Sequence, residues 1–215
     1  TPLRAELNKR FSSKEQAEAF LESCKQASYT IDSISKRPTQ RTPAPPFTTS
    51  TLQQEAARKL GFPVAVTMRV AQSLYESGLI TYMRTDSMNL SDLCLNSCAP
   101  VITNIMGANY HQRRTYHTHA KGAQEAHEAI RPTDMARQTI TGDSREQRLY
   151  ELIWKRTIAC QMANAQLERT TVNISVTSAT ASHNGYYFQA TGEVVKFDGF
   201  LRVYHESQGD DDNAN

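Results

Sequence analysis

A tyrosine and an arginine two positions apart are the residues of this sequence best suited to chemistry. Tyr82 and Arg84 follow a helix that the pattern predicts to end at Gly78, and they lie in a short piece predicted to be extended. Residues two apart in an extended chain point the same way, so both side chains could meet one phosphate. A guanidinium beside a phenol favours the ionised phenol and neutralises charge on a phosphodiester, as covalent phosphoryl transfer requires. Spacing alone also allows an ordinary Tyr and Arg at the rim of a core.

A second polar group lies downstream, at His127, Glu128 and Arg131. The pattern predicts a polar turn leading into a helix there, where a His beside a Glu is often merely solvated. Arg131 could contact a phosphate or form a salt bridge, and the sequence leaves both interpretations open. His117 and His119 have no further ligands at zinc-site spacing, so we expect a flexible basic loop and no metal site in this chain.

The middle of the chain is predicted to be helical. Periodicity and capping residues predict helices over 12–27, from Thr51 to Leu60, over 64–77, over 91–110 and from Ser144 to Ala165. Gly61 and Pro63 separate the second and third of these, which is the layout of a helix-turn-helix. Many helical hairpins that bind nothing look the same, so this layout is weak support for DNA binding.

The two ends are predicted to be β-rich. Residues 29–35 and 172–176 read as strands, and Asn184-Gly185 is a hairpin signal before a strand over 186–197. Prolines in the connector 36–46 should forbid regular structure there. We therefore expect an α+β fold, in which a mostly helical, CAP-like or helix-turn-helix domain is inserted into a small antiparallel β domain. The expected boundaries are 1–45 with 166–207 for the β-rich arch domain, 46–165 for the helical domain and 208–215 for an acidic disordered tail.

The charge distribution suits a polyanionic partner. The formal net charge is +2, and without the three aspartates of the tail it is +5, from 24 basic and 19 acidic residues. Residues 36–70 carry six basic side chains against the single acid Glu55, although a solvated basic face would look the same. The long uncharged stretches, 93–112 and 170–192, are rich in Ser, Thr and Asn, which excludes membrane spans.

Three segments resemble the type IA DNA topoisomerases, the bacterial topoisomerase I family. The stretch Gln72–Asp86, QSLYESGLITYMRTD, is similar to the active-site signature of that family. The stretches Pro46–Gln54, PFTTSTLQQ, and Gln124–Thr133, QEAHEAIRPT, look like two further motifs in the same order. The resemblance runs from about Asn8 to Tyr204 and leaves only the acidic tail outside.

The resemblance implies a role for each matching residue. Tyr82 would be the nucleophile that becomes linked to a 5′-phosphate of one DNA strand, Arg84 would hold the scissile phosphate, and His127 would support it. Arg131 would be a further candidate DNA contact. The expected substrate is a single-stranded segment of negatively supercoiled duplex DNA, which the enzyme, an isomerase, would relax without ATP.

The resemblance also implies that parts of the enzyme lie elsewhere. In this family a separate metal-binding domain supplies acidic Mg²⁺ ligands, and this chain has no Asp-x-Asp cluster outside its tail. We therefore interpret the chain as a fragment that partners such a domain of the same polypeptide, in the cytoplasm at the nucleoid, and that is inactive alone. The alternatives are a non-catalytic helix-turn-helix DNA-binding module and an interaction scaffold.

Overall fold

The chain folds into two compact units that differ in secondary structure. The computed structural model describes residues 3–116, 127–177 and 185–205. One unit combines Thr1–Arg41 with Gln166–Phe197 and is built on a sheet, and the other combines Thr42–Ala165 with Asp198–Asn215 and is mainly helical. The expected α+β class with an antiparallel sheet is confirmed.

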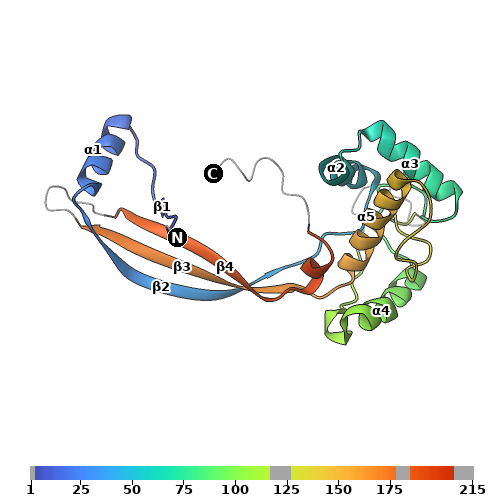
Figure 1. Ribbon diagram of the computed structural model, residues 1–215. Helices are drawn as coiled ribbons and strands as arrows, with labels where there is room; N and C mark the ends of the chain where they lie inside the picture. The colour runs from blue at the N-terminus through green and yellow to red at the C-terminus, as the bar shows by residue number, and fades with distance from the viewer. Residues whose placement is uncertain (1–2, 117–126, 178–184, 206–215) are drawn as a thin grey trace. The chain divides into compact units, whose positions relative to one another are not determined.

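The β unit is a twisted antiparallel sheet whose strands lie in the order β1-β4-β3-β2 (Figure 1). The strands are β1 Glu6–Leu7, β2 Ser28–Arg41, β3 Ala165–Thr177 and β4 Tyr187–Phe197, and helix α1 spans Lys14–Cys24. Ile174 of β3 lies opposite Phe188 of β4, so these two apolar residues form a cross-strand pair. The ring of Phe20 on α1 lies 6.1 Å from that of Phe188, so the helix supplies the apolar cover of this end of the sheet.

One expectation about the connector is wrong. β2 continues through Pro38 to Arg41, whereas the prolines were expected to exclude regular structure from residue 36 onward. The reason is the position of β2 at the edge of the sheet, where a residue without a backbone N–H can face outward and leave the ladder intact. Irregular structure begins only at Thr42, ahead of Pro43 and Pro45.

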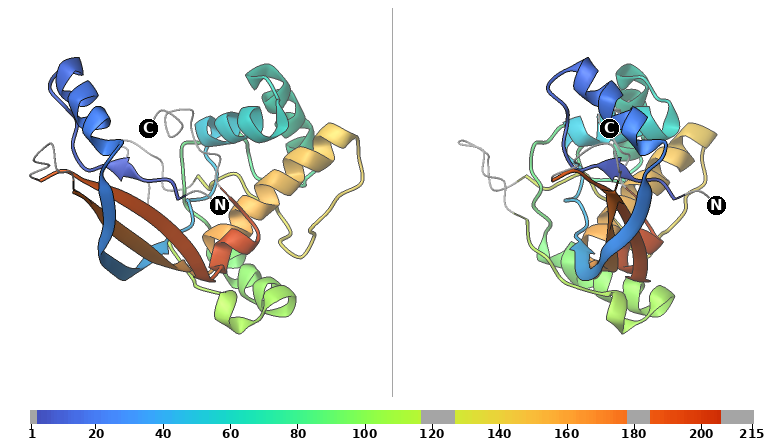
Figure 2. Two further views of the ribbon diagram at one scale, coloured as in Figure 1. Left: turned by 60° about the vertical axis from the view of Figure 1, so that its left-hand side comes forward. Right: turned by 90° about the vertical axis from the view of Figure 1, so that its left-hand side faces the viewer.

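The helical unit is built around three helices that pack on one another. They are α2 Thr49–Leu60, α3 Val64–Glu76 and α5 Ser144–Cys160, with α4 Asp92–Met106 and the short 3-10 turns η1 Ala108–Tyr110 and η2 Gly199–Arg202 beside them. Figure 2 shows α3 and α5 side by side. Leu52, Leu74 and Ile153, one from each of the three packed helices, are fully buried between them. No described helix is both long and apolar enough to span a bilayer.

Two details of these helices differ from expectation. α2 begins at Thr49, with Thr48 as its N-cap, so Thr51 closes the capping box from inside the first turn instead of opening the helix. α5 ends at Cys160 and β3 starts at Ala165, whereas a helix to Ala165 was expected. In both places the local sequence signal was real, and its position was off by two to five residues.

The last described residues return to the helical unit, although the expected β domain ran to residue 207. The hydroxyl of Tyr204 donates to Glu55 of α2 at 2.6 Å, and the hydroxyl of Tyr110 donates to Asp198 at 2.7 Å. Gly199 has a φ of +51°, which favours glycine, and this turn brings its Cα close to the backbone of Ala163. These contacts join the segment 198–205 to the helical unit.

Candidate active site

The three motif segments meet in the helical unit through backbone hydrogen bonds. The N–H of Ile130 donates to the carbonyl of Phe47 at 2.8 Å, and the N–H of Thr81 donates to the carbonyl of Arg131 at 2.9 Å. Antiparallel bridges join Phe47 to Ile130 and Ile80 to Pro132. Because the third motif pairs with both of the others, residues far apart in sequence become neighbours at one place.

Threonine hydroxyls add hydrogen bonds between the three segments around residues 81–85, here called the tyrosine loop. The hydroxyl of Thr81 donates to the carbonyl of Ala129 at 2.7 Å and accepts the N–H of Arg131 at 2.9 Å. From the other side, the hydroxyl of Thr49 lies 2.8 Å from the carbonyl oxygen of Met83. The backbone on both sides of Tyr82 is therefore held by neighbouring segments.

Tyr82 and Arg84 are both exposed, and the residue between them is buried. The side chain of Met83 is 1% exposed, whereas Tyr82 is 46% exposed and Arg84 also faces solvent. The loop is not a strand, yet this alternation is what an extended piece would give. Within the described ranges Arg84 makes no hydrogen bond or ion pair, so its charge is available to a ligand.

His127 opens the described part of the third motif and is exposed. The expected turn into a helix is wrong here, because the segment after His127 is extended and pairs with Phe47 and Ile80. The motif residues Gln124–Ala126 lie outside the described residues. His127 lies two residues before Ala129, whose carbonyl accepts a hydrogen bond from Thr81, the residue that precedes Tyr82.

Arg131 is buried and bonded within the protein. Its guanidinium forms an ion pair with Glu128 at 2.6 Å, and it also donates to the carbonyl of Pro132 and the hydroxyl of Ser91. Glu128 in turn accepts the N–H of Ser91, the N-cap of α4, at 2.8 Å. Of the two alternatives for Arg131, the salt bridge is the one that the structure shows, and a direct phosphate contact stays a prediction.

Comparison with known proteins places this arrangement in a family. The family model described as DNA topoisomerase matches residues 3–215. The chain belongs to the DNA topoisomerase family. DNA topoisomerase 1 of Zymomonas mobilis is 51% identical over 205 residues, which cover 94% of this chain and 16% of that protein. The prokaryotic-type DNA topoisomerase 1 of Acanthamoeba polyphaga mimivirus is 46% identical over 201 residues, or 24% of its length.

A solved structure supports the same assignment. Full-length topoisomerase I from Thermotoga maritima matches with a TM-score of 0.74 and 33% identity, over 96% of this chain and 34% of that one. The match covers both units of the chain. This chain therefore corresponds to a minor share of the length of each topoisomerase compared.

The described residues do not form a metal site of their own. Across residues 3–116, 127–177 and 185–205, no three His, Cys, Asp or Glu side chains converge as metal ligands would. A magnesium ion would need several oxygen ligands, which these residues do not bring together.

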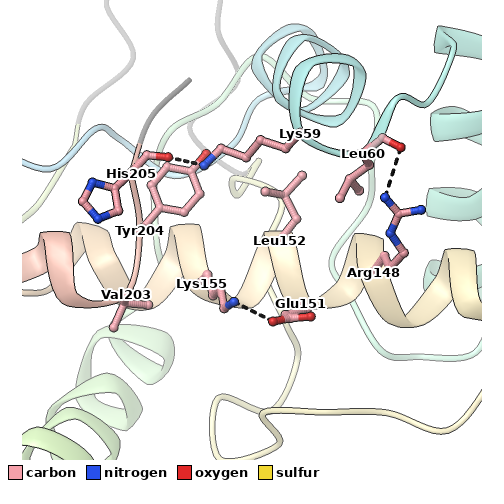
Figure 3. A pocket seen from close by; sticks show the side chains of 9 residues that line it. All are labelled: Lys59, Leu60, Arg148, Glu151, Leu152, Lys155, Val203, Tyr204 and His205. Carbon is pink, nitrogen blue, oxygen red and sulfur yellow. Dashed lines mark hydrogen bonds and ion pairs between the residues drawn. The ribbon is translucent and has the colours of Figure 1, made fainter. Parts of the chain in front are cut away.

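A basic hollow elsewhere in the helical unit is distinct from the tyrosine loop. It has a volume of about 440 Å³ and is lined by residues of α2, α5 and the segment after η2 (Figure 3). Its cations already have partners: Lys59 binds the carbonyl of His205, Arg148 binds the carbonyl of Leu60, and Lys155 pairs with Glu151. Cations bound in this way are poorly placed to hold an anion, so we assign no ligand to this hollow.

Sequence reasoning missed the residues that build the site without touching a substrate. Thr49 and Thr81 support the motif backbone through their hydroxyls, and the hydroxyl of Ser91 accepts a hydrogen bond from the guanidinium of Arg131. Ser91 could have been found as an N-cap, since Asp92 and an apolar pattern follow it. Nothing in the local pattern distinguishes Thr49 from Thr48 or Thr51, because its partners lie more than 30 residues away.

Proposed function

We propose that this chain is the tyrosine-bearing part of a type IA DNA topoisomerase. The complete enzyme would cleave one DNA strand through a 5′-phosphotyrosine link and relax negative supercoils without ATP. The observation that carries the proposal is the exposure of Tyr82 and Arg84 on either side of buried Met83, on a loop that two other motif segments fix. Family membership supports the same reading.

The chemistry would be a reversible exchange of phosphodiesters. The phenolic oxygen of Tyr82 attacks the phosphorus, an oxygen–phosphorus bond forms, and the bond from phosphorus to the 3′ oxygen breaks. The phenol loses its proton, and the departing 3′ oxygen gains one. One phosphodiester replaces another, so resealing needs no ATP, and the free energy stored in the supercoils drives relaxation.

Arg84 and His127 would act on the charge of the attacked phosphate. In phosphoryl transfer the protein mainly positions groups and stabilises charge on the oxygens of phosphorus. Arg84 suits this task because its guanidinium is exposed two residues from the nucleophile. His127, exposed in the paired third motif, would add a second contact from a neighbouring segment.

The remaining parts of the reaction would come from outside this chain. The chain spans 16% to 24% of the two curated relatives described above, and its described residues do not gather the ligands of a magnesium ion. We therefore propose that a metal-binding domain of the same polypeptide supplies them, and that the chain alone does not cleave DNA. A DNA substrate would place the complete enzyme at the nucleoid.

The test uses the complete polypeptide that carries this chain, with magnesium and a single-stranded oligonucleotide, followed by denaturation. A 5′-phosphotyrosine link retains the downstream fragment, so we expect a protein-bound band with a 3′ label and only a shortened free strand with a 5′ label. Tyr82→Phe should abolish the band and Arg84→Ala should weaken it. Tyr29→Phe, which alters another exposed tyrosine, is the control and should cleave normally.

A non-catalytic helix-turn-helix module is the second candidate, favoured by the α2–Gly61–α3 layout. That function predicts preference for duplex over single-stranded DNA and indifference to Tyr82→Phe. Comparison of the affinities for the two DNA forms distinguishes the two functions. The salt dependence of affinity does not, because phosphate contacts make it steep in either case. Preference for single strands supports the topoisomerase reading.

A further inference from the structure

We propose that Thr49 is a positioning residue for strand cleavage, which holds the tyrosine loop in its reactive shape through its side-chain hydroxyl. The inference rests on the proposed function and gives Thr49, a residue of the first motif, a role in cleavage that the family resemblance did not assign. Thr49 would not touch the DNA. It would act through Met83 and Thr85, the two residues that flank Arg84.

Thr49 binds the loop on both sides of Arg84. Its backbone N–H donates to the carbonyl of Thr85 at 2.9 Å, and its hydroxyl accepts the N–H of Thr85 at 2.9 Å. The hydroxyl oxygen lies 2.8 Å from the carbonyl oxygen of Met83 and 3.1 Å from that of Thr85. A hydroxyl can donate only one hydrogen bond. Donation to the carbonyl of Met83 is favoured, because that distance is the shorter one and because the carbonyl of Thr85 already accepts the backbone N–H of Thr49.

The residue is itself firmly anchored. Thr49 is the first residue of α2, immediately after the N-cap Thr48. On one side Leu52 is fully buried in the helical core, and on the other Phe47 pairs with Ile130 of the third motif. Thr49 therefore transmits the rigidity of α2 to the loop.

Loss of the hydroxyl would free the backbone around Arg84. The carbonyl of Met83 and the N–H of Thr85 would both lose a partner, while the bond from the backbone of Thr49 to Thr85 would remain. The loop could then turn between residues 83 and 85, which shifts the guanidinium relative to the phenol of Tyr82. Misplacement of a reacting group by about 1 Å can cost about 100-fold in rate.

The test compares Thr49→Val with Thr49→Ser in the complete polypeptide. Valine keeps the shape and the backbone N–H and removes the hydroxyl, whereas serine restores the hydroxyl. With saturating oligonucleotide and magnesium, we expect the rate of adduct formation to fall about 10- to 100-fold in Thr49→Val and to stay within about threefold of wild type in Thr49→Ser. Affinity for the oligonucleotide, measured with Tyr82→Phe added to prevent cleavage, should change less than about twofold.

Thr51→Val is the matched control. It removes another hydroxyl of the same helical turn and weakens the capping box. Among the described residues, the hydroxyl of Thr51 forms hydrogen bonds with Thr48 and with no residue of the tyrosine loop. We expect it to lower stability and to leave the cleavage rate near wild type. Thr49→Ala is a second variant without the hydroxyl, and it must slow cleavage as well. The test therefore does not depend on whether the Thr49→Val variant folds well.

Wild-type cleavage by Thr49→Val or Thr49→Ala overturns the inference, and so does an equal loss in Thr51→Val. An equal rate in Thr49→Ser and Thr49→Val also contradicts it, because the hydroxyl would then be irrelevant. These results are separate from the proposed function. If Tyr82→Phe still forms the adduct, the nucleophile is wrong; if only the Thr49 variants behave as wild type, the proposed function stands without this role.

Discussion

The rings of Tyr75 and Tyr82 meet edge to face, with centroids 5.2 Å apart and planes inclined at 66°. Tyr75 lies near the end of α3 and is 41% exposed, and Tyr82 is 46% exposed. A helix with a buried opposite face thus supports the ring of the proposed nucleophile. Such contacts favour one ring orientation, which matters for a phenol that must approach phosphorus in line.

Replacement of Tyr75 tests this support. Tyr75→Ala removes the edge-to-face contact, which is worth about 0.5–1.5 kcal/mol, so adduct formation by the complete polypeptide should slow by about two- to tenfold. Tyr75→Phe keeps the ring and should cleave at the wild-type rate. If Tyr75→Phe slows cleavage as much as Tyr75→Ala, the hydroxyl of Tyr75 is what matters and the ring contact is not the cause.

The buried ion pair of Arg131 with Glu128 predicts a structural effect. Arg131→Met should lower the free energy of unfolding by about 2–3 kcal/mol in urea, because the carboxylate of Glu128 and the hydroxyl of Ser91 lose their partner. Arg69→Met is the control, because Arg69 is an exposed arginine of α3. This substitution should change the free energy of unfolding by less than about 0.5 kcal/mol.

The same variant separates the two interpretations of Arg131. If Arg131 only supports the fold, the slope of DNA affinity against salt should be unchanged in Arg131→Met. Arg84→Met, by contrast, should reduce that slope by about one, as expected for one lost phosphate contact. An equal reduction in Arg131→Met would favour the phosphate contact over the purely structural role.

Tyr150 predicts a pH dependence of stability. Burial raises the pKa of Tyr150 to about 12, and its hydroxyl donates to the carbonyl of Arg137 at 2.6 Å. Above pH 10 the unfolded chain loses this proton and the folded chain keeps it, so the contribution is complete below pH 10 and is lost as pH rises through about 12.

Tyr150→Phe provides the comparison. It should be less stable than wild type at pH 8 by about 1 kcal/mol, because the carbonyl of Arg137 loses its hydrogen bond. Its stability should then fall less steeply than that of wild type between pH 10 and 12, so the two curves converge. Parallel curves in urea titrations across this range would contradict the assignment.

The backbone conformation at Gly199 requires a glycine at this position. Its φ is +51°, and a Cβ at this position would lie 2.5 Å from the carbonyl oxygen of Ala163. Gly199→Ala should therefore destabilise the chain by about 3 kcal/mol or more in urea unfolding. Gly192→Ala is the control, since no atom lies within 4 Å of a Cβ there and its φ is not positive; it should be near neutral.

Features that depend on near neighbours in sequence could be predicted. α3 and the start of α5 lie where periodicity and capping residues placed them, and Gly61 ends α2 in the left-handed conformation. The exposure of Tyr82 and Arg84 around a buried residue also follows from simple alternation. These signals span four residues or fewer.

Features that depend on partners far away in the sequence could not be predicted in this way. The segment after His127 is extended because Ile130 pairs with Phe47, 83 positions away, and Pro132 pairs with Ile80, 52 positions away. This pairing overrides the local polar pattern. Arg131 had two open interpretations because the positions of Glu128 and Ser91 were unknown. Pro38 fits a strand only because β2 lies at a sheet edge, which the strand's own sequence does not reveal.

The most direct test of the central claim is to identify the protein atom that carries the broken strand. The adduct of the complete polypeptide with a single-stranded oligonucleotide would be trapped by denaturation, digested with protease and nuclease, and analysed by mass spectrometry. The account predicts a nucleotide 5′-phosphate on the peptide that contains Tyr82, and no adduct in Tyr82→Phe. A nucleotide on another residue, or an undiminished adduct in Tyr82→Phe, would contradict it.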